Sequence, residues 1–170
     1  MPIPDIKLLL LDVDGVLTDG SINITTTGTE LKRFYVRDGS GIIMWRKHGL
    51  LTGILTGRPS PITTLRAAEL GIELVEQCAA MDKLQGYESL CAQAGVQDHQ
   101  VAYIGDDLAD IPVLTRCAYP ITVADATDEA KQVAKFITTK PGGHGAVREA
   151  IEHLLKAMNL WETTLDDYGL

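Results

Sequence analysis

Short apolar runs alternate with longer segments of helical periodicity along most of this 170-residue chain. The apolar runs are too short to span a membrane and predict strands that are covered on both faces. The alternation is typical of βαβ units, so we expect an α/β fold, a Rossmann-like doubly wound parallel sheet with helices on both faces. The predicted strands span Lys7–Leu11, Leu51–Leu55, Glu73–Glu76, Val101–Ile104, Ile121–Val123 and Phe136–Thr138. The predicted helices span Ser40–His48, Ser60–Leu70, Asp82–Ala94, Leu108–Thr115, Asp128–Val133 and Ala146–Asn159.

One segment interrupts this alternation. Ser21–Thr25 and Thr29–Val36 flank a glycine-containing turn and predict a β-hairpin, inserted at about residues 20–36 of a single domain that spans residues 1–170. A two-stranded hairpin is marginally stable alone in water, so it should pack on another surface. That surface is either its own domain or, in the interpretation we favour, a second copy in an oligomer.

Composition narrows the classes of function. The net charge of −8 argues against nucleic acid or an anionic membrane as a partner, and an anionic substrate would require locally gathered cations. No apolar stretch is long enough for a transmembrane helix, and the N-terminus lacks the pattern of a signal peptide. The three scattered cysteines predict free thiols in a reducing cytoplasm.

Two groups of acids follow predicted strands. Asp12 and Asp14 end the first apolar run, with Gly15 permitting a tight turn, and Asp106, Asp107 and Asp110 follow Val101–Ile104. Ligands of open α/β sheets gather beyond the carboxyl ends of the strands, where so many carboxylates require a cation. Oxygen ligands suit Mg²⁺, although helix capping by Asp106 or Asp107 would account for one acid.

Cations and phosphate-binding candidates occur at other strand and helix ends. Thr56 and Gly57 precede a predicted helix and could bind phosphate oxygens, or Thr56 could simply cap that helix. Lys83 lies at a helix N-terminus, where the dipole disfavours a cation. The run from Lys32 to Gly41 holds three cations and is either a ligand-facing or a solvated segment, with Arg37 and Asp38 the stronger candidates.

The C-terminal region adds a glycine-rich turn. Residues 140–145 precede a helix and could present N–H groups to an anion or form an ordinary flexible turn. We expect His144 to be exposed rather than catalytic. The tail from Trp161 to Leu170 is acidic, and the sequence assigns it no role.

The order of these motifs resembles that of the haloacid dehalogenase superfamily. It runs Asp-x-Asp-Gly-x-Leu-Thr-Asp-Gly, Thr-Gly-Arg, Lys and Gly-Asp-Asp-x-x-Asp. "KRFYVRDG", "VADA" and "PGGHGAVRE" look like the capless phosphatases that act on 3-deoxy-D-manno-octulosonate 8-phosphate, which have a small hairpin in place of a cap domain. The segment "EQCAAMDKL" departs from the usual glycine-containing loop before the lysine.

The resemblance implies roles for the candidate residues. Asp12 would be the nucleophile and Asp14 the general acid and base, while Thr56 and Lys83 would hold the phosphoryl oxygens. The side chains of Asp12 and Asp106 and the main-chain carbonyl of Asp14 would bind Mg²⁺. Asp107 and Asp110 would orient the metal and the lysine.

The resemblance also implies a substrate and partners. We expect a phosphorylated sugar acid of lipopolysaccharide synthesis, bound in a homotetramer whose hairpins help to close the sites. Candidates to contact the substrate are Arg37, Gly57, Arg58, Lys140 and Arg148. Two alternatives stay open: a phosphatase for a nine-carbon sugar-acid 9-phosphate, and a phosphorelay receiver-type signalling domain.

Overall fold

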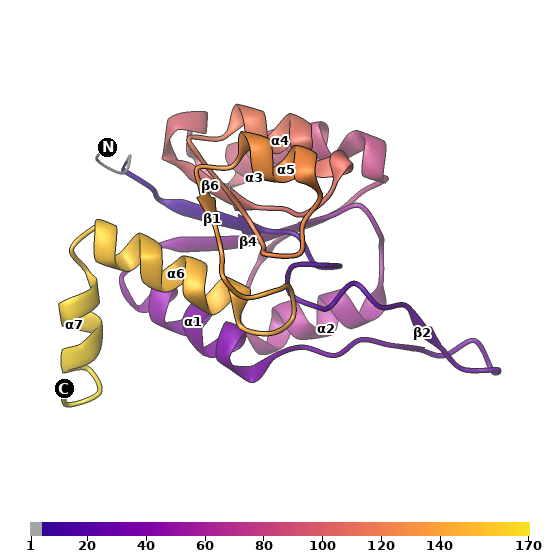
Figure 1. Ribbon diagram of the computed structural model, residues 1–170, viewed down its shortest axis with the longest axis horizontal. Coiled ribbons are helices and arrows are strands. Elements are labelled where there is room, and N and C mark those ends of the chain that lie inside the picture. The colour runs from indigo at the N-terminus through magenta and orange to yellow at the C-terminus, as the bar shows by residue number, and fades with distance from the viewer. Residues whose placement is uncertain (1–4) are drawn as a thin grey trace.

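The computed structural model describes residues 5–170 and confirms the predicted parallel α/β sheet (Figure 1). In the described chain, six parallel strands follow the order β5-β4-β1-β6-β7-β8. Counted along the chain without the hairpin, this is the doubly wound order 3-2-1-4-5-6, in which the strand order reverses between β1 and β6. The strands are β1 (Leu8–Leu11), β4 (Leu51–Thr56), β5 (Leu74–Gln77), β6 (Val101–Ile104), β7 (Tyr119–Thr122) and β8 (Phe136–Ile137).

Helices cover both faces of the sheet. One layer holds α3, α4 and α5 and the other α1, α2 and α6, with the sheet between them (Figure 1). The four leucines of β1 are completely buried, as expected for a central strand covered on both sides. The helices are α1 (Val36–Lys47), α2 (Pro61–Glu69), α3 (Lys83–Ala94), α4 (Ile111–Arg116), α5 (Asp128–Val133), α6 (Ala146–Ala157) and α7 (Trp161–Asp166).

Two boundaries differ from the predictions for identifiable reasons. Helix α1 begins at Val36, four residues before the predicted start, because Gly39 lies inside the helix rather than in a loop. A Cβ at residue 41 would lie 3.0 Å from Cδ of Arg148 on α6, so a glycine allows the two helices to pack closely. In the predicted helix Leu108–Thr115, the first turn is a 3₁₀ turn, Leu108–Asp110, and α4 follows with Pro112 in its own first turn.

The predicted hairpin is present but short. Its strands are β2 (Asn23–Ile24) and β3 (Glu30–Leu31), joined by a turn in which Gly28 has a φ of +81°. The hairpin projects from the body of the molecule (Figure 1). Its apolar side chains Ile22, Ile24 and Leu31 are largely exposed.

The C-terminal tail forms α7, which the sequence did not predict. Thr164 is buried, and its hydroxyl lies 2.8 Å from Nε2 of His48 at the end of α1. Within residues 5–170, no helix combines the length and apolar character that crossing a membrane requires.

Candidate active site

The site lies where the strand order reverses, at the carboxyl ends of β1, β4 and β6. Strand pairing sets Leu11 opposite both Ile54 and Ile104, and the N–H of Asp12 donates to the carbonyl of Ile104 at 3.0 Å. Asp12, Thr56 and Asp106 therefore emerge at one edge although they lie far apart in the sequence. They line one cavity of about 200 Å³ together with Asp14, Gly57, Arg58, Ala80, Lys83, Asp107, Ala109 and Asp110.

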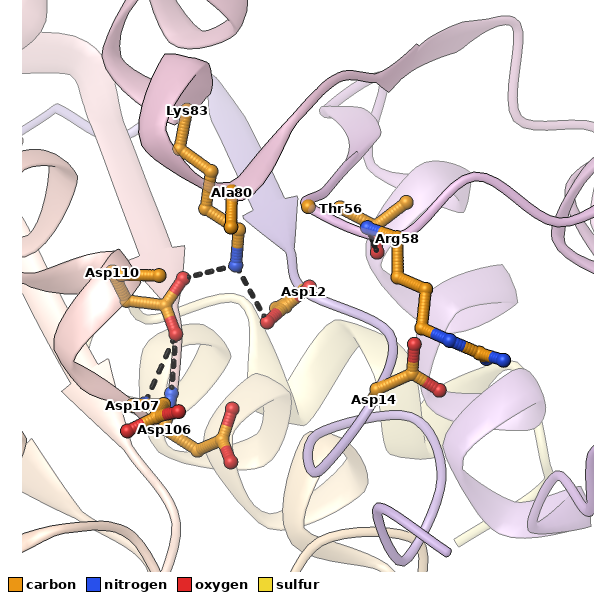
Figure 2. A pocket seen from close by; sticks show the side chains of 11 residues that line it. Asp12, Asp14, Thr56, Arg58, Ala80, Lys83, Asp106, Asp107 and Asp110 are labelled. Carbon is orange, nitrogen blue, oxygen red and sulfur yellow. Dashed lines mark hydrogen bonds and ion pairs between the residues drawn. The ribbon is translucent and has the colours of Figure 1, made fainter. Parts of the chain in front are cut away.

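Lys83 joins the two acidic groups. Its Nζ lies 2.8 Å from Oδ2 of Asp12 and 2.6 Å from Oδ1 of Asp110 (Figure 2). All three side chains are nearly completely buried. Burial alone would lower the pKa of Lys83, but the two carboxylates outweigh it and hold that pKa above its ordinary value. The lysine is therefore a fixed cation beside the nucleophile candidate.

Asp110 organises this arrangement rather than facing the cavity with a free oxygen. Its Oδ2 accepts hydrogen bonds from the N–H groups of Asp106 and Asp107, each at 3.0 Å. Its Oδ1 accepts from Lys83 and from the hydroxyl of Tyr103, a completely buried residue of β6. The sequence analysis missed Tyr103; the signal was a phenol in a strand otherwise made of apolar side chains, where a buried hydroxyl needs a partner.

The buried acids have too few cationic partners, so their ionised forms are disfavoured unless a further cation binds beside them. Burial, and then the charge of Asp110, raise the pKa of Asp12 to about 7 despite Lys83. Burial followed by Asp12 raises that of Asp106 to about 8. Oδ1 of Asp106 is buried without a hydrogen-bond partner in residues 5–170.

Carboxylate oxygens of Asp12, Asp106 and Asp110 lie within 4.8 Å of one another. Each Asp110 oxygen already accepts two hydrogen bonds, whereas each Asp12 oxygen accepts one and Oδ1 of Asp106 accepts none among the described residues. Asp12 and Asp106 are therefore the side chains that fit a hard cation such as Mg²⁺. Gly15, at a φ of +86°, makes room beside them, since a Cβ there would lie 2.1 Å from Oδ2 of Asp106. Asp107 has a different role because it caps the 3₁₀ turn that follows β6.

Thr56 and Gly57 bring the end of β4 against the turn that carries Lys83. A Cβ at residue 57 would lie 2.8 Å from Cα of Ala80, so glycine permits this close approach. The hydroxyl of Thr56 is buried and accepts from the N–H of Arg58 at 3.3 Å. The guanidinium of Arg58 forms an ion pair with Glu30 of the hairpin.

The other residues predicted to contact a substrate, Arg37, Lys140 and Arg148, are not among the residues that line this cavity in the described part of the chain. Arg37 is exposed in the first turn of α1, and Lys140 is exposed before α6. Nε of Arg148 lies 2.6 Å from a carboxylate oxygen of Glu152 one turn along the same helix. Their contact with a substrate stays a prediction.

The glycine-rich segment 140–145 packs on the loop that follows β1 instead of offering free N–H groups to an anion. The N–H of Gly142 donates to Asp125 at 2.9 Å, that of Gly143 to the carbonyl of Val16 at 3.0 Å, and that of Gly145 to Asp38 at 3.3 Å. A Cβ at residue 142 would lie 1.7 Å from the carbonyl oxygen of Gly15. The interpretation as an anion cradle is therefore not supported, because internal acceptors already use these donors.

Two further predictions concern this region. Asp38 is 1% exposed, and its carboxylate accepts from the N–H groups of Gly145 and Arg148, so it caps α6. Arg37 and Asp38 thus do not act as a pair at the cavity of the described chain. His144 is exposed, as expected.

Comparison with known proteins agrees with this geometry. Residues 72–151 match the model of the haloacid dehalogenase-like hydrolases. The chain is 40% identical over 153 residues to the 3-deoxy-D-manno-octulosonate 8-phosphate phosphatase of Haemophilus influenzae, covering 90% of this chain and 84% of that one. It is 42% identical over 158 residues to the Yersinia pestis phosphatase of the same name, covering 93% and 84%.

Solved structures give the same result. The structure of 3-deoxy-D-manno-octulosonate 8-phosphate phosphatase from Moraxella catarrhalis in complex with magnesium, phosphate and the sugar acid superposes with a TM-score of 0.93 at 40% identity, covering 97% of this chain and 94% of that one. A cobalt-bound structure of the Haemophilus influenzae phosphatase gives a TM-score of 0.89 at 38% identity, covering 94% and 92%. The chain therefore belongs to the haloacid dehalogenase-like hydrolases, within the family of 3-deoxy-D-manno-octulosonate 8-phosphate phosphatases.

Proposed function

We propose that this chain is a Mg²⁺-dependent phosphomonoesterase that converts 3-deoxy-D-manno-octulosonate 8-phosphate to the free sugar acid and phosphate, as the names of its relatives suggest. The observation that carries the proposal is the contact of Lys83 with Asp12 and Asp110 beside Asp106, at the point where the strand order reverses. A receiver-type signalling domain has the strand order 2-1-3-4-5 instead. The strand order and the relatives both favour the enzyme.

In this proposal, hydrolysis proceeds in two displacements. An Asp12 oxygen attacks phosphorus, the bond from phosphorus to the sugar oxygen breaks, and that oxygen takes a proton from the Asp14 carboxyl. Water then attacks the aspartyl-phosphate, Asp14 takes its proton back from that water, and phosphate leaves. The enzyme regains both carboxyl groups in their starting states.

The surrounding residues would bind the phosphoryl group and the metal. The side chains of Asp12 and Asp106 and the main-chain carbonyl of Asp14 would hold Mg²⁺, which neutralises charge on the phosphoryl oxygens. Lys83 and Thr56 would hold those oxygens as charge moves in the transition state. Asp110 would orient Lys83, and Asp107 would support the loop that carries Asp106.

For the substrate's sugar acid, we propose contacts to Gly57 and Arg58 at the cavity and to Arg37, Lys140 and Arg148 farther out. In support, Arg58 lines the cavity, and its ion pair with Glu30 uses Nη1, so that the other N–H groups of the guanidinium can donate to a second carboxylate. The carboxylate of a sugar acid is a chemically equivalent partner.

We further propose a single domain that assembles as a homotetramer and acts in the cytoplasm in lipopolysaccharide precursor synthesis. The exposed fractions of Ile22, Ile24 and Leu31 on the hairpin are 61%, 62% and 58%, a surface that association would bury. The free thiols of the three cysteines are compatible with a reducing compartment. Light scattering of the purified protein tests the tetramer.

The substrate is tested by kcat/KM in Mg²⁺ for eight-carbon and nine-carbon sugar-acid phosphates and for hexose phosphates. We expect the eight-carbon compound to be hydrolysed best. A higher kcat/KM for the nine-carbon compound would identify that compound as the substrate instead. An equal kcat/KM for hexose phosphates would contradict selectivity for sugar acids.

A further inference from the structure

Strand β3 and the two residues that follow it turn alternate side chains toward the active site. In the segment from Glu30 to Arg33, the side chains of Glu30 and Lys32 are 20% and 2% exposed. Leu31 is 58% exposed and the side chain of Arg33 is 70% exposed. Successive residues of an extended chain point to opposite sides, so only one of the two adjacent cations in this segment is directed inward.

Lys32 reaches Asp14, the proposed general acid and base. Its ammonium group forms an ion pair with Oδ1 of Asp14. Oδ2 of the same carboxyl group is buried and has no hydrogen-bond partner in the described residues, and Asp14 lines the catalytic cavity. The two oxygens thus differ: one is held by a cation, and the other is available to a reacting group.

The position of Lys32 is itself fixed. Its Nζ also lies 3.9 Å from Oε1 of Glu30. Glu30 is anchored to the body of the molecule through Arg58 and through the hydroxyl of Ser60, which donates to Oε2 at 2.8 Å. Ser60 caps α2, so the chain of contacts runs from a helix end to the Asp14 carboxyl group.

We propose that Lys32 is a positioning residue for proton transfer, holding Oδ1 of Asp14 so that Oδ2 faces the oxygen of the departing alcohol. This inference rests on the proposed function, in which Asp14 gives its proton to that oxygen. Lys32 acts through Asp14 and leaves the attack by Asp12 unchanged.

The role has a specific kinetic signature. An alkoxide is a poor leaving group and needs the proton, whereas p-nitrophenolate leaves without one. kcat/KM reports steps up to the first phosphoryl transfer, so the later use of Asp14 in hydrolysis does not affect it. Removing the ion pair between Lys32 and Asp14 should therefore lower kcat/KM for alkyl phosphates and leave that for p-nitrophenyl phosphate nearly unchanged.

The test measures kcat/KM of wild type and Lys32→Met for a series of alkyl and aryl phosphates of increasing leaving-group pKa. We expect a loss of about 10- to 100-fold for alkyl phosphates, within the range for general acid catalysis. For p-nitrophenyl phosphate, we expect a change of less than about threefold, because that step needs no proton. Lys32→Arg, which keeps a cation, should restore much of the loss.

Arg33→Met is the matched control, because Arg33 is the neighbouring cation and pairs with Asp19 outside the cavity. Equal loss on all substrates in Lys32→Met, or no loss on any, would overturn the positioning role. Circular dichroism spectra establish that each variant is folded. Failure of the wild type to hydrolyse any phosphate monoester would instead refute the proposed function, so the two failures are distinct.

Discussion

Replacing Asp110 with Asn tests the reasoning about the buried charge network most directly. The carboxylate of Asp110 accepts from Lys83, Tyr103 and two backbone N–H groups, and its residue is completely buried. Asn has the same shape, but one of its terminal atoms is an NH₂ donor. If that NH₂ group faces the two backbone N–H groups, both of their hydrogen bonds are lost. If it faces Lys83 and Tyr103, the phenol can rotate to accept from it and only the contact with Lys83 is lost. In both orientations Lys83 loses one of its two anionic partners.

The expected cost follows from this count. A buried polar group left without its partner costs about 1–3 kcal/mol, and breaking a buried ion pair costs about 3–5 kcal/mol. The charge of Asp110 also raises the pKa of Asp12, and relief of that repulsion offsets part of the cost. We expect the free energy of unfolding to fall by about 3 kcal/mol, which lowers Tm by about 6–12 °C in a chain of this size.

The same substitution should reduce activity. Lys83 would keep only Asp12 as an ionic partner and would lose its fixed position at the phosphoryl oxygens. Losing one preorganised electrostatic group costs about 10²- to 10³-fold in kcat. Thermal unfolding and steady-state hydrolysis of p-nitrophenyl phosphate in Mg²⁺ measure the two effects.

Tyr103→Phe is the matched control for Asp110→Asn. It removes a single donor to Asp110 and introduces no opposing one, so it should cost only about 1 kcal/mol. Equal destabilisation by Tyr103→Phe and Asp110→Asn would contradict the hydrogen-bond count. Full activity and an unchanged Tm in Asp110→Asn would refute the positioning of Lys83 altogether.

Three other perturbations address the nucleophile, the metal and the glycine-rich segment. Asp12→Asn should abolish nearly all turnover, with circular dichroism showing an intact fold; substantial residual activity would exclude Asp12 as nucleophile. The pKa values of Asp12 and Asp106 are raised to about 7 and about 8, so protonation of these groups stabilises the metal-free fold. This contribution is fully present below their ordinary pKa of 3.8 and is lost as the pH rises through 7–8. Mg²⁺ at 100 times its Kd should raise the free energy of unfolding by about 2.7 kcal/mol, which raises Tm by about 5–10 °C. Calorimetry should find this gain at pH 8.5 and a smaller gain at pH 6, where protons compete with Mg²⁺ for the carboxylates. Equal gains at the two pH values would contradict the raised pKa values. Gly142→Ala places a methyl group 1.7 Å from the carbonyl oxygen of Gly15, and should lower the free energy of unfolding by at least about 3 kcal/mol and lower kcat as well, whereas a wild-type Tm would show that the segment moves freely.

The sheet and the acidic edge of the site were predictable because their signals are local. Leu8–Leu11 form a continuous apolar run that ends at Asp12, and parallel strands place such ends together. The predicted start of α1 was wrong because Gly39 favours a loop locally. Only the tertiary contacts, α2 against Gly39 and α6 against Gly41, explain two glycines inside a helix.

Side-chain partnerships between distant segments were not predictable from periodicity. Asp38 was a candidate to face a ligand together with Arg37, but its carboxylate caps α6, and the N–H groups that it accepts from lie more than a hundred residues away in the sequence. The N–H groups of the glycine-rich segment looked available because nothing local accepts from them. The inward turn of Lys32 could have been inferred from its strand alternation with Glu30, whereas its contact with Asp14 required the folded chain.

The packing of Gly142 and Gly143 on the loop that follows Asp12 has a consequence for biosynthesis. Every residue assigned to chemistry or metal binding lies before residue 111. These residues leave the ribosome well before Gly142 and Gly143, which pack on the loop after β1. A nascent chain stalled near residue 140 thus carries the complete set of reactive groups. It lacks the segment that packs against the loop after Asp12 and holds that loop in place. Hydrolytic competence should arise only once the last quarter of the polypeptide has been synthesised.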